Sequence, residues 1–326
     1  MISGKQTILV LSDIHYACGL ERARRGHESM AIKNPLLRLL VTGFRHFIWL
    51  RDPFGHNLLL DQVLDQPVPV DYAIANGDYS CDTGFVGVSD EAACRSAQEC
   101  LGKLRERFRD KFYATIEDHE LGKMSLFGGL RRMRLASWHR TREVLKLEPF
   151  WELRLGNYLL IGVVSSLLAL PVYEPETLPE ERDDWQQLRV AHFNQIRRAF
   201  AALLPHERVL LFCHDPTALP FLWQDELIRR RLPQVEQTVI GHLHSELVFW
   251  KSRLLAGMPR IRFLGNSIRR MSTALNEGKH WRPFKVRLCP SLAGSELLKD
   301  GGYYLLELDP AAQHPAQFRF QRLKRG

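Results

Sequence analysis

The stretch Thr238-Val239-Ile240-Gly241-His242-Leu243-His244 is a short apolar run that stops at a glycine and then presents two histidines two positions apart. A buried strand that runs into a tight turn would hold both imidazoles near one point, and neutral imidazole is the commonest metal ligand in proteins. A His-x-His pair taken alone is more often a surface or core feature. The pattern gains weight because four other apolar runs of the chain also end in possible ligands.

Two of these runs lie in the first quarter of the chain. Residues 7–12 are continuous β-prone hydrophobics, typical of a strand buried on both faces, and they lead into Asp13-Ile14-His15. Residues 70–76 predict a second strand, which ends at Gly77-Asp78. Each motif has a plainer interpretation, because Asp13 is a good turn cap and Gly-Asp is a common turn.

The other two runs follow later in the chain. Residues 111–116 predict a strand that leads into Glu117-Asp118-His119-Glu120, and residues 208–213 predict one that ends at His214. A solvated loop and a core histidine are the plainer interpretations here. Five strand ends with carboxylates or imidazoles are harder to explain in this way, because ligands of α/β sheets bind outside the carboxyl ends of the strands. We therefore expect all five ends to form one site.

The rest of the chain alternates between strand and helix patterns. Residues 91–109 and 185–204 have apolar side chains at helical spacing, which predicts amphipathic helices that cover a sheet. Further strands are predicted at 158–165, 303–308 and 317–323, and an apolar stretch at 261–267 follows the two histidines. The length of 326 residues, with 45% hydrophobic and 25% charged, favours a single α/β domain over residues 1–326 that carries insertions.

The composition predicts the cellular compartment and the charge of the binding partners. The six cysteines are scattered and form no Cys-x-x-Cys pair, so we expect a reducing, cytoplasmic compartment. We expect neither a signal peptide nor a membrane span, because no apolar run is long enough. The formal charge of +8 indicates anionic partners such as nucleic acid, phosphorylated metabolites or an acidic membrane surface.

The ordered set of strand-end motifs resembles the calcineurin-like metallophosphoesterase family, whose pattern is Asp-x-His, Gly-Asp, Gly-Asn-His-Asp/Glu, His and Gly-His-x-His. The resemblance covers roughly residues 7–267, including the Gly-Asn-Ser at 265–267. It implies a four-layer αββα sandwich of two mixed β-sheets flanked by helices, with a two-metal site on one edge. It also implies that helical insertions lie near the active-site edge.

The resemblance assigns a role to each motif. His119 falls on the family's histidine, which contacts the scissile phosphate and can protonate the leaving group, so it is the implied catalytic residue. The implied metal ligands are Asp13, His15 and His244 for the first ion, His214, His242 and Asp118 for the second, and Asp78 between the two.

The chemistry of these residue types agrees with that assignment. Mixed carboxylate and imidazole ligands suit manganese, iron or zinc more than magnesium or calcium, and we expect two divalent ions, with manganese favoured. Two such ions about 4 Å apart would lower the pKa of a bridging water, and the resulting hydroxide would attack a phosphodiester or pyrophosphate bond. Three features depart from the family, and one of them is that Asp82 lies four residues after Asp78 rather than three, so the family's second aspartate is not assigned to it. Glu117 replaces glycine, which removes backbone freedom, and Asp118 replaces asparagine, which should tighten metal binding.

Two basic insertions are predicted, at 20–52 and 121–142. Residues 20–51 contain seven basic and two acidic residues, and residues 121–142 contain six Lys or Arg and no acid. Residues 36–50, read as a helix, leave only a narrow polar stripe. Basic, apolar helices of this kind lie in the plane of anionic membranes. The alternative is that both segments pack on the sheet. The membrane interpretation predicts a peripheral protein on the inner face of a membrane, with a lipid-linked or nucleotide-containing phosphorylated substrate.

A third predicted insertion, cap-like, spans 268–302. It begins next to the site, so Arg269 and Arg270 are candidates to bind a second phosphate or a nucleotide. Two other functions stay open. A nuclease would explain the positive charge through phosphate contacts, although a lysine-rich groove would then be expected. A non-enzymatic scaffold on a decayed fold is kept open by Glu117 and Asp118.

Overall fold

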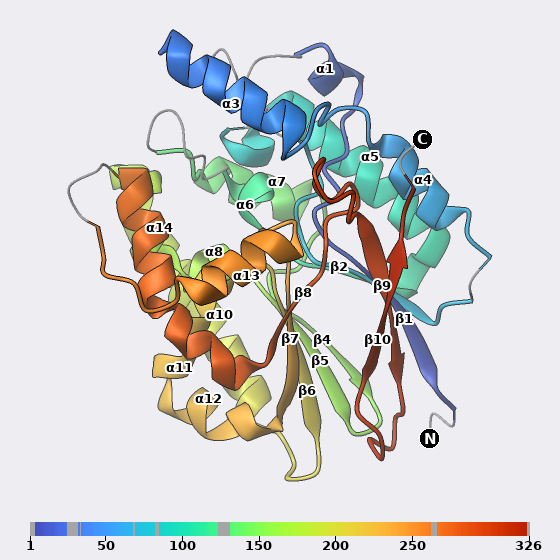
Figure 1. Ribbon diagram of the computed structural model, residues 1–326. Helices are drawn as coiled ribbons and strands as arrows, with labels where there is room; N and C mark the ends of the chain where they lie inside the picture. Colours follow the sequence, from blue (N-terminus) through green and yellow to red (C-terminus); the bar gives the residue numbers. More distant parts are fainter. Residues whose placement is uncertain are drawn as a thin grey trace.

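Two β-sheets packed face to face, with helices on both outer sides, form the computed structural model (Figure 1). The structure describes residues 4–24, 32, 34–67, 69–81, 85–122, 131–261 and 266–324. Both sheets have five strands and both are mixed. This arrangement confirms the predicted α/β sandwich of two mixed sheets flanked by helices.

The first sheet has the strand order β10-β9-β1-β2-β3, in which β1, β2 and β3 are parallel and β9 and β10 are antiparallel to their neighbours. The parallel strands bring their carboxyl ends to one edge of the sandwich. The strands are β1 (Gln6–Leu11), β2 (Tyr72–Ala75), β3 (Phe112–Ala114), β9 (Gly302–Leu308) and β10 (Gln317–Arg322).

The second sheet has the order β4-β5-β6-β7-β8, in which β5 to β8 are parallel and β4 is antiparallel to β5. Residues 286–288 lie within the stretch 268–302, which we predicted to be a cap-like insertion, yet they form the edge strand β8 of this sheet. The strands are β4 (Trp151–Leu155), β5 (Tyr158–Val163), β6 (Arg208–Cys213), β7 (Val235–Ile240) and β8 (Val286–Leu288).

The continuous apolar strands are buried on both faces, as their sequences predict. In β1, Ile8 and Val10 pack into the core between the two sheets, whereas Leu9 and Leu11 pack under the helices. In β6, Leu210 likewise faces the other sheet. A strand enclosed in this way has no solvent face, so its first polar side chains appear where the strand ends.

Thirteen helices are described, and Figure 1 shows α4 and α5 outside the first sheet and α10 to α12 outside the second. Among the described helices, none is both long and apolar enough to cross a bilayer. The helices are α1 (Gly19–Arg22), α3 (Pro35–Phe47), α4 (Asn57–Leu64), α5 (Glu91–Phe108), α6 (Asp118–Leu121), α7 (Leu135–Glu143), α8 (Ser165–Leu168), α9 (Leu170–Tyr173), α10 (Arg182–Ala201), α11 (Leu219–Gln224), α12 (Glu226–Arg231), α13 (Glu246–Leu254) and α14 (Asn266–Glu277).

Three predicted segments fall partly outside the described residues, and the first is the insertion at 20–52, of which residues 25–31 and 33 are not described. Residues 123–130 of the predicted insertion at 121–142 are not described, and its remainder contains α7. Residues 262–265 of the apolar stretch at 261–267 are also outside the description, and α14 begins at Asn266 directly after them.

Candidate metal centre

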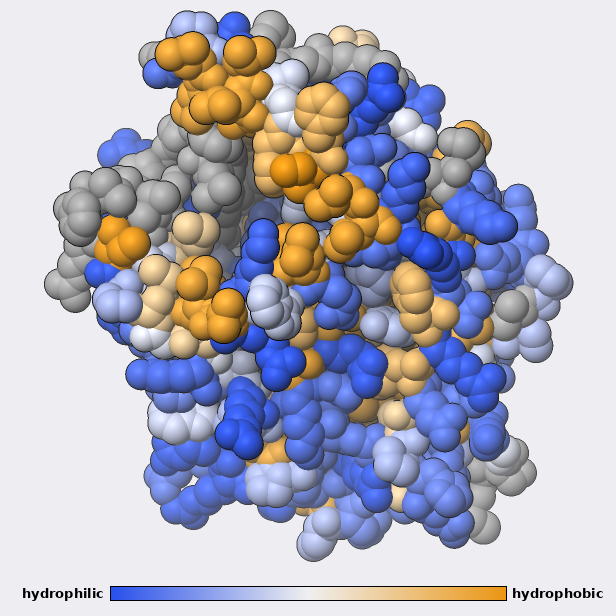
Figure 2. Space-filling view, in the orientation of Figure 1, coloured by the Kyte–Doolittle hydropathy of each residue, from blue (hydrophilic) through white to orange (hydrophobic). Residues whose placement is uncertain are grey.

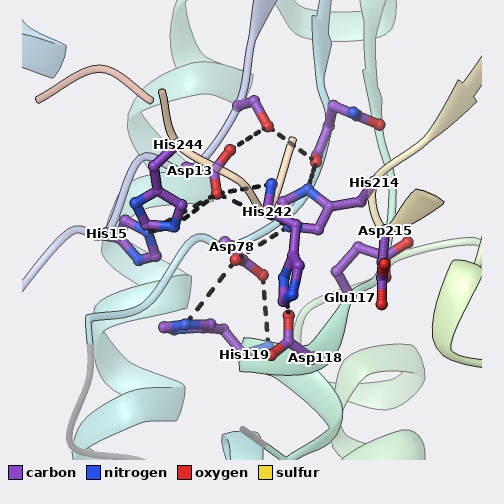
Figure 3. A network of polar contacts seen from close by, with 12 residues as sticks. Asp13, His15, Asp78, Glu117, Asp118, His119, His214, Asp215, His242 and His244 are labelled. Carbon is purple, nitrogen blue, oxygen red and sulfur yellow. Dashed lines mark hydrogen bonds and ion pairs between the residues drawn. The ribbon is translucent and has the colours of Figure 1, made fainter. Parts of the chain in front are cut away.

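The five strand ends meet at one edge of the sandwich. The loops after β1 and β2 run side by side, because the backbone N–H of Asp13 donates to Gly77 O (3.2 Å) and that of His15 donates to Asp78 O (3.1 Å). The loop after β7 joins them, since His242 N donates to Asp13 Oδ1 (3.1 Å). All seven predicted ligands and His119 are thereby brought together (Figure 3).

The first group of ligands contains Asp13, His15, Asp78 and His244, each of which offers an atom within 4.8 Å of the others. His244 Nε2 lies 3.0 Å from Asp13 Oδ1, and the Nε2 atoms of His15 and His244 lie 3.3 Å apart. Two ring nitrogens that face each other at this distance are placed as two ligands of one cation would be. This group could hold a metal ion.

The second group contains Asp78, Asp118, His214 and His242, again with atoms within 4.8 Å of one another. His214 Nε2 lies 3.1 Å from Asp78 Oδ2, and His242 Nδ1 lies 3.5 Å from Asp118 Oδ1. Asp118 Oδ1 is buried and accepts no hydrogen bond within the described part of the chain. A buried carboxylate oxygen normally has a partner, so this group too could hold a metal ion, and Asp78 belongs to both groups.

Backbone strain accompanies the site. Asp13, His15, Asp78, His242 and His244 all have positive φ, between 49° and 61°. Residues with side chains rarely adopt this left-handed conformation, which is found where the surrounding structure enforces it, often at functional sites. Tight turns at the strand ends therefore orient five of the seven predicted ligands.

Two glycines make these turns possible. Gly77 has φ +91°, and a Cβ on it would lie 2.6 Å from the Cγ atom of Glu117. A Cβ on Gly241 would lie 2.1 Å from Ser12 Oγ and 2.6 Å from a carboxylate oxygen of Asp13. The glycines of the Gly-Asp and Gly-His-x-His motifs are thus required because other loops of the site pass within contact distance of them.

Backbone carbonyls orient the rings. His15 Nδ1 lies 3.3 Å from Ser80 O, and His119 Nδ1 lies 3.1 Å from Ser80 O and 3.0 Å from Cys81 O. His214 Nδ1 contacts the carbonyl of Asn76. A carbonyl beside Nδ1 places the proton there and directs Nε2 into the site, which is the usual support for a ligating histidine.

Charge differs between the two groups. Burial and the neighbouring imidazoles of His119 and His244 lower the pKa of His15 to about 4, so this ring is neutral, as a metal ligand must be. Burial by itself would lower the pKa of His242, but the carboxylates of Asp215 and Asp118 raise it to about 10. A cation in the second group would displace a proton from that ring, so metal binding there releases protons.

Glu117, which stands where the family has glycine, needs no special backbone freedom. Its φ is −139° and its ψ −165°, an extended conformation that any residue adopts. Its carboxyl group is buried and accepts hydrogen bonds from the backbone N–H of Ser165 (2.9 Å) and from the Ser165 hydroxyl (2.5 Å). Burial raises the pKa of Glu117 to about 8. This side chain points away from both ligand groups and connects the β3 loop to the end of β5.

Two residues beside the site were missed from the sequence. The Glu120 carboxylate accepts from the backbone N–H groups of Asp78 (3.3 Å), Tyr79 (2.9 Å) and Glu117 (3.0 Å), which fixes the Gly-Asp turn against α6. A capping box of Glu117 and Glu120 is the sequence signal that could have identified it. Trp49 stacks on His244 with 4.9 Å between ring centroids, a contact with no local signal.

Arg269 and Arg270, the predicted substrate-binding pair, lie on α14. Arg270 Nη1 forms an ion pair with Glu176 Oε1 (2.7 Å), in which both side chains are largely buried. Its guanidinium also lies over the ring of Tyr173, which in turn contacts Asp215 next to His214. The charge of Arg270 is thus compensated by Glu176, and substrate binding by Arg269 and Arg270 stays a prediction.

Comparison with known proteins found a likeness among solved structures. The sequence matches no known family and no curated protein. Among solved structures, it is similar to the crystal structure of phosphopantetheinyl hydrolase from Mycobacterium tuberculosis, with 17% sequence identity and a TM-score of 0.35. The alignment covers 74% of this chain and 84% of that one.

Proposed function

We propose that this chain is a metal-dependent hydrolase of phosphodiester or pyrophosphate bonds and a member of the calcineurin-like metallophosphoesterase family. The observation that carries the proposal is the division of seven ligand candidates into two groups that share Asp78. A shared carboxylate is what a pair of closely spaced ions requires. The ligands come from five separate strand ends in the order that the family pattern has them.

Two divalent ions bound there would stabilise the charge on the phosphoryl oxygens and lower the pKa of bound water. The protein supplies the geometry. Asp78 fixes the spacing of the two groups, and the carbonyls beside His15 and His214 hold the rings so that Nε2 faces inward. Strained turns at Asp13 and His242 are set by the fold, so little rearrangement is needed to form the site.

We assign the role of proton donor to His119. Its Nδ1 faces two backbone carbonyls and therefore carries a proton, while its Nε2 points toward Asp78 Oδ2 at 3.9 Å. The imidazolium form of this ring carries a second proton on Nε2. As a water oxygen bonds to phosphorus and the bond from phosphorus to the leaving oxygen breaks, that proton passes to the leaving oxygen.

The substrate class that we favour is a lipid-linked or nucleotide-containing diester or pyrophosphate. Supporting it is the aromatic and apolar surface next to the ligands, where the Trp49 ring lies on His244. An indole at this place gives an apolar moiety or a base a flat surface to pack against.

The test is metal analysis of the purified protein together with hydrolysis of bis-p-nitrophenyl phosphate. We expect Mn²⁺ to support hydrolysis, EDTA to abolish it, and added Mn²⁺ to restore it. His244→Ala should lower the metal content, whereas His139→Ala, which removes an exposed histidine of α7, should leave it unchanged. Hydrolysis that persists after confirmed metal removal would contradict the proposal. A folded protein that binds no metal would favour the scaffold alternative.

A further inference from the structure

Helix α3 has its apolar side chains in solvent. None of its 13 residues is buried, and Leu36, Leu40 and Phe47 are 72%, 70% and 70% exposed. Figure 2 shows these apolar side chains gathered over α3 at the top of the molecule. Surface helices of globular proteins normally turn such a face toward the core.

The apolar residues of α3 form one broad face. Leu36, Leu40, Phe44 and Phe47 lie three or four positions apart and therefore project from the same side of the helix. Arg38 lies on the opposite side, where its guanidinium donates two hydrogen bonds to Ile32 O, at 3.1 and 2.8 Å. Arg38 thus contacts the segment before the helix, whereas Leu36, Leu40 and Phe47 project into solvent and Phe44, which is 49% exposed, also contacts Trp49.

Capping rather than packing explains why α3 is helical. The Asn34 side chain accepts hydrogen bonds from the backbone N–H groups of Leu36 (3.0 Å) and Leu37 (3.2 Å), and Pro35 occupies the first helical position. Helices of this length are marginal in water without an apolar face packed against something. The described structure therefore contains a preformed helix whose main stabilising contact is still to be made.

Basic residues lie near the end of α3. An open cavity of about 890 Å³ adjoins the chain just after α3, and among its lining residues are four basic and two acidic ones. The exposed Leu297 extends the apolar surface, because its backbone N–H donates to Ile48 O at the end of α3 (3.2 Å). The basic lining residues are Arg51, Lys299, Arg322 and Lys324, and the acidic ones are Asp52 and Glu296.

We propose that α3 lies in the interface of an anionic lipid bilayer, with Leu36, Leu40, Phe44 and Phe47 among the acyl chains and the basic cavity on the headgroups. A wide apolar face with basic residues near one end matches an acidic lipid surface. A helix that binds a protein groove presents a narrower stripe. This proposal does not depend on the hydrolase proposal, because binding to lipid requires neither metal nor catalysis.

The docking face is directly connected to the candidate metal centre. The ring of Phe44 stacks on that of Trp49 with 6.3 Å between centroids, and Trp49 stacks on His244. A protein bound to lipid through α3 would therefore hold its metal centre beside the membrane surface.

The experiment is sedimentation of the full-length, metal-free protein with phosphatidylcholine vesicles that contain or lack phosphatidylglycerol. We expect binding to the anionic vesicles, weakened by salt, and a bound fraction about tenfold lower for Leu36→Glu/Leu40→Glu. The matched control is Val190→Glu/Leu204→Glu, which changes two exposed residues at α10 and after it, 55% and 52% exposed. Circular dichroism verifies that both variants are folded.

Three results would overturn the proposal. The first is no sedimentation of the wild-type protein with anionic vesicles. The second is an equal loss of binding in the α3 variant and the α10 control, which would mean that added negative charge alone explains the effect. The third is a lipid-free oligomer that Leu36→Glu/Leu40→Glu dissociates, since a second copy would then cover α3. Arg51→Glu/Lys299→Glu should also weaken binding, and unchanged binding would contradict the role of the basic cavity.

Discussion

The metal-centre edge of the sandwich and helix α3 depart from the usual distribution of side chains in opposite directions. At the edge, Asp13, Asp78 and Asp118 are buried carboxyl groups. On α3, Leu36 and Leu40 are apolar groups left in water. Acidic residues are rarely buried without a partner, and large exposed apolar patches mark interaction sites. We infer from the buried carboxylates that the edge binds a cation, and from the exposed apolar side chains that α3 binds an apolar phase.

Completion has different consequences in the two regions. At the edge, burial by itself would raise the pKa of Asp13 and Asp78, but nearby imidazoles, His244 and His214 foremost, keep both pKa values low. The pKa of Asp118 is lowered as well, so the carboxylates of Asp13, Asp78 and Asp118 all stay charged, and a cation would offset that charge. On α3 the apolar side chains are exposed to water, and a lipid phase would cover them. We expect metal binding to change stability and chemistry, and lipid binding to change location.

The largest effect is expected when the carboxylate that both ligand groups share is removed. Asp78→Asn should abolish hydrolysis and remove metal from both positions, because this side chain belongs to each group. It should leave vesicle binding through α3 unchanged. Metal analysis, hydrolysis of bis-p-nitrophenyl phosphate and vesicle sedimentation, made on one preparation, check the three parts.

The control for Asp78→Asn is Asp61→Asn, since Asp61 is paired with Lys103 on the surface, away from the centre. It should keep both metal and hydrolysis. Full activity in Asp78→Asn would show that the two groups do not work as a pair. A variant that loses metal and vesicle binding together would show that the two regions are not independent.

A smaller effect is expected at His119, which borders the ligand groups without belonging to either. His119→Ala should slow hydrolysis of a substrate with a poor alkoxide leaving group by about 10²- to 10⁴-fold. Hydrolysis with p-nitrophenolate as leaving group should fall much less, because that group leaves without a proton. Metal content should not change.

Comparison of the two leaving groups is the internal control for His119. Equal loss with both would mean that His119 positions the phosphate and does not donate a proton. A loss of metal in His119→Ala would instead place this ring among the ligands, beside Asp78 Oδ2 at 3.9 Å.

The strand ends could be predicted because each depends on local signals. Apolar runs such as residues 7–12 and 208–213 predict strands buried on both faces, and a polar residue directly after such a run can only lie at the sheet edge. All seven predicted ligands are accordingly found in the two groups, although their binding of metal stays a prediction. The pattern of strands and amphipathic helices predicted an α/β domain, and the resemblance to the metallophosphoesterase family implied the two-sheet sandwich.

Features set by distant contacts could not be predicted. The spacing of α3 predicts a helix with an apolar face, but the sequence does not say whether that face meets the sheet or the solvent. Glu117 accepts from Ser165, which is 48 positions away, so its buried role was not visible from the motif around it. Trp49 and His244 are joined only by the folded chain. Strands β4 and β8 were not predicted, and β8 lies inside the stretch that was predicted as a cap-like insertion.

The smallest effect on hydrolysis is expected at Asp118, the position where the family has asparagine. Its carboxylate lies 3.5 Å from His242 Nδ1, and although burial would raise its pKa, the imidazoles of His242, His119 and His214 lower it well below the usual value. Asp118→Asn keeps an oxygen for the second group and removes one charge. We expect hydrolysis to be retained, with an Mn²⁺ requirement about tenfold higher.

Thermal unfolding connects this last variant to the contrast between the two regions. Because the neighbouring imidazoles lower the pKa of Asp118, its charge stabilises the metal-free fold through His242, so Asp118→Asn should lower the melting temperature of the metal-free protein and reduce the further increase that Mn²⁺ gives. Asp118→Ala, which removes the oxygen as well, should lose metal from the second group and serves as the control. An inactive Asp118→Asn with normal metal content would mean that hydrolysis by this chain needs a carboxylate at position 118, where the family has asparagine. A metal-free melting temperature that rises would mean that the buried charge of Asp118 destabilises the fold until a cation binds, and that its contact with His242 does not compensate.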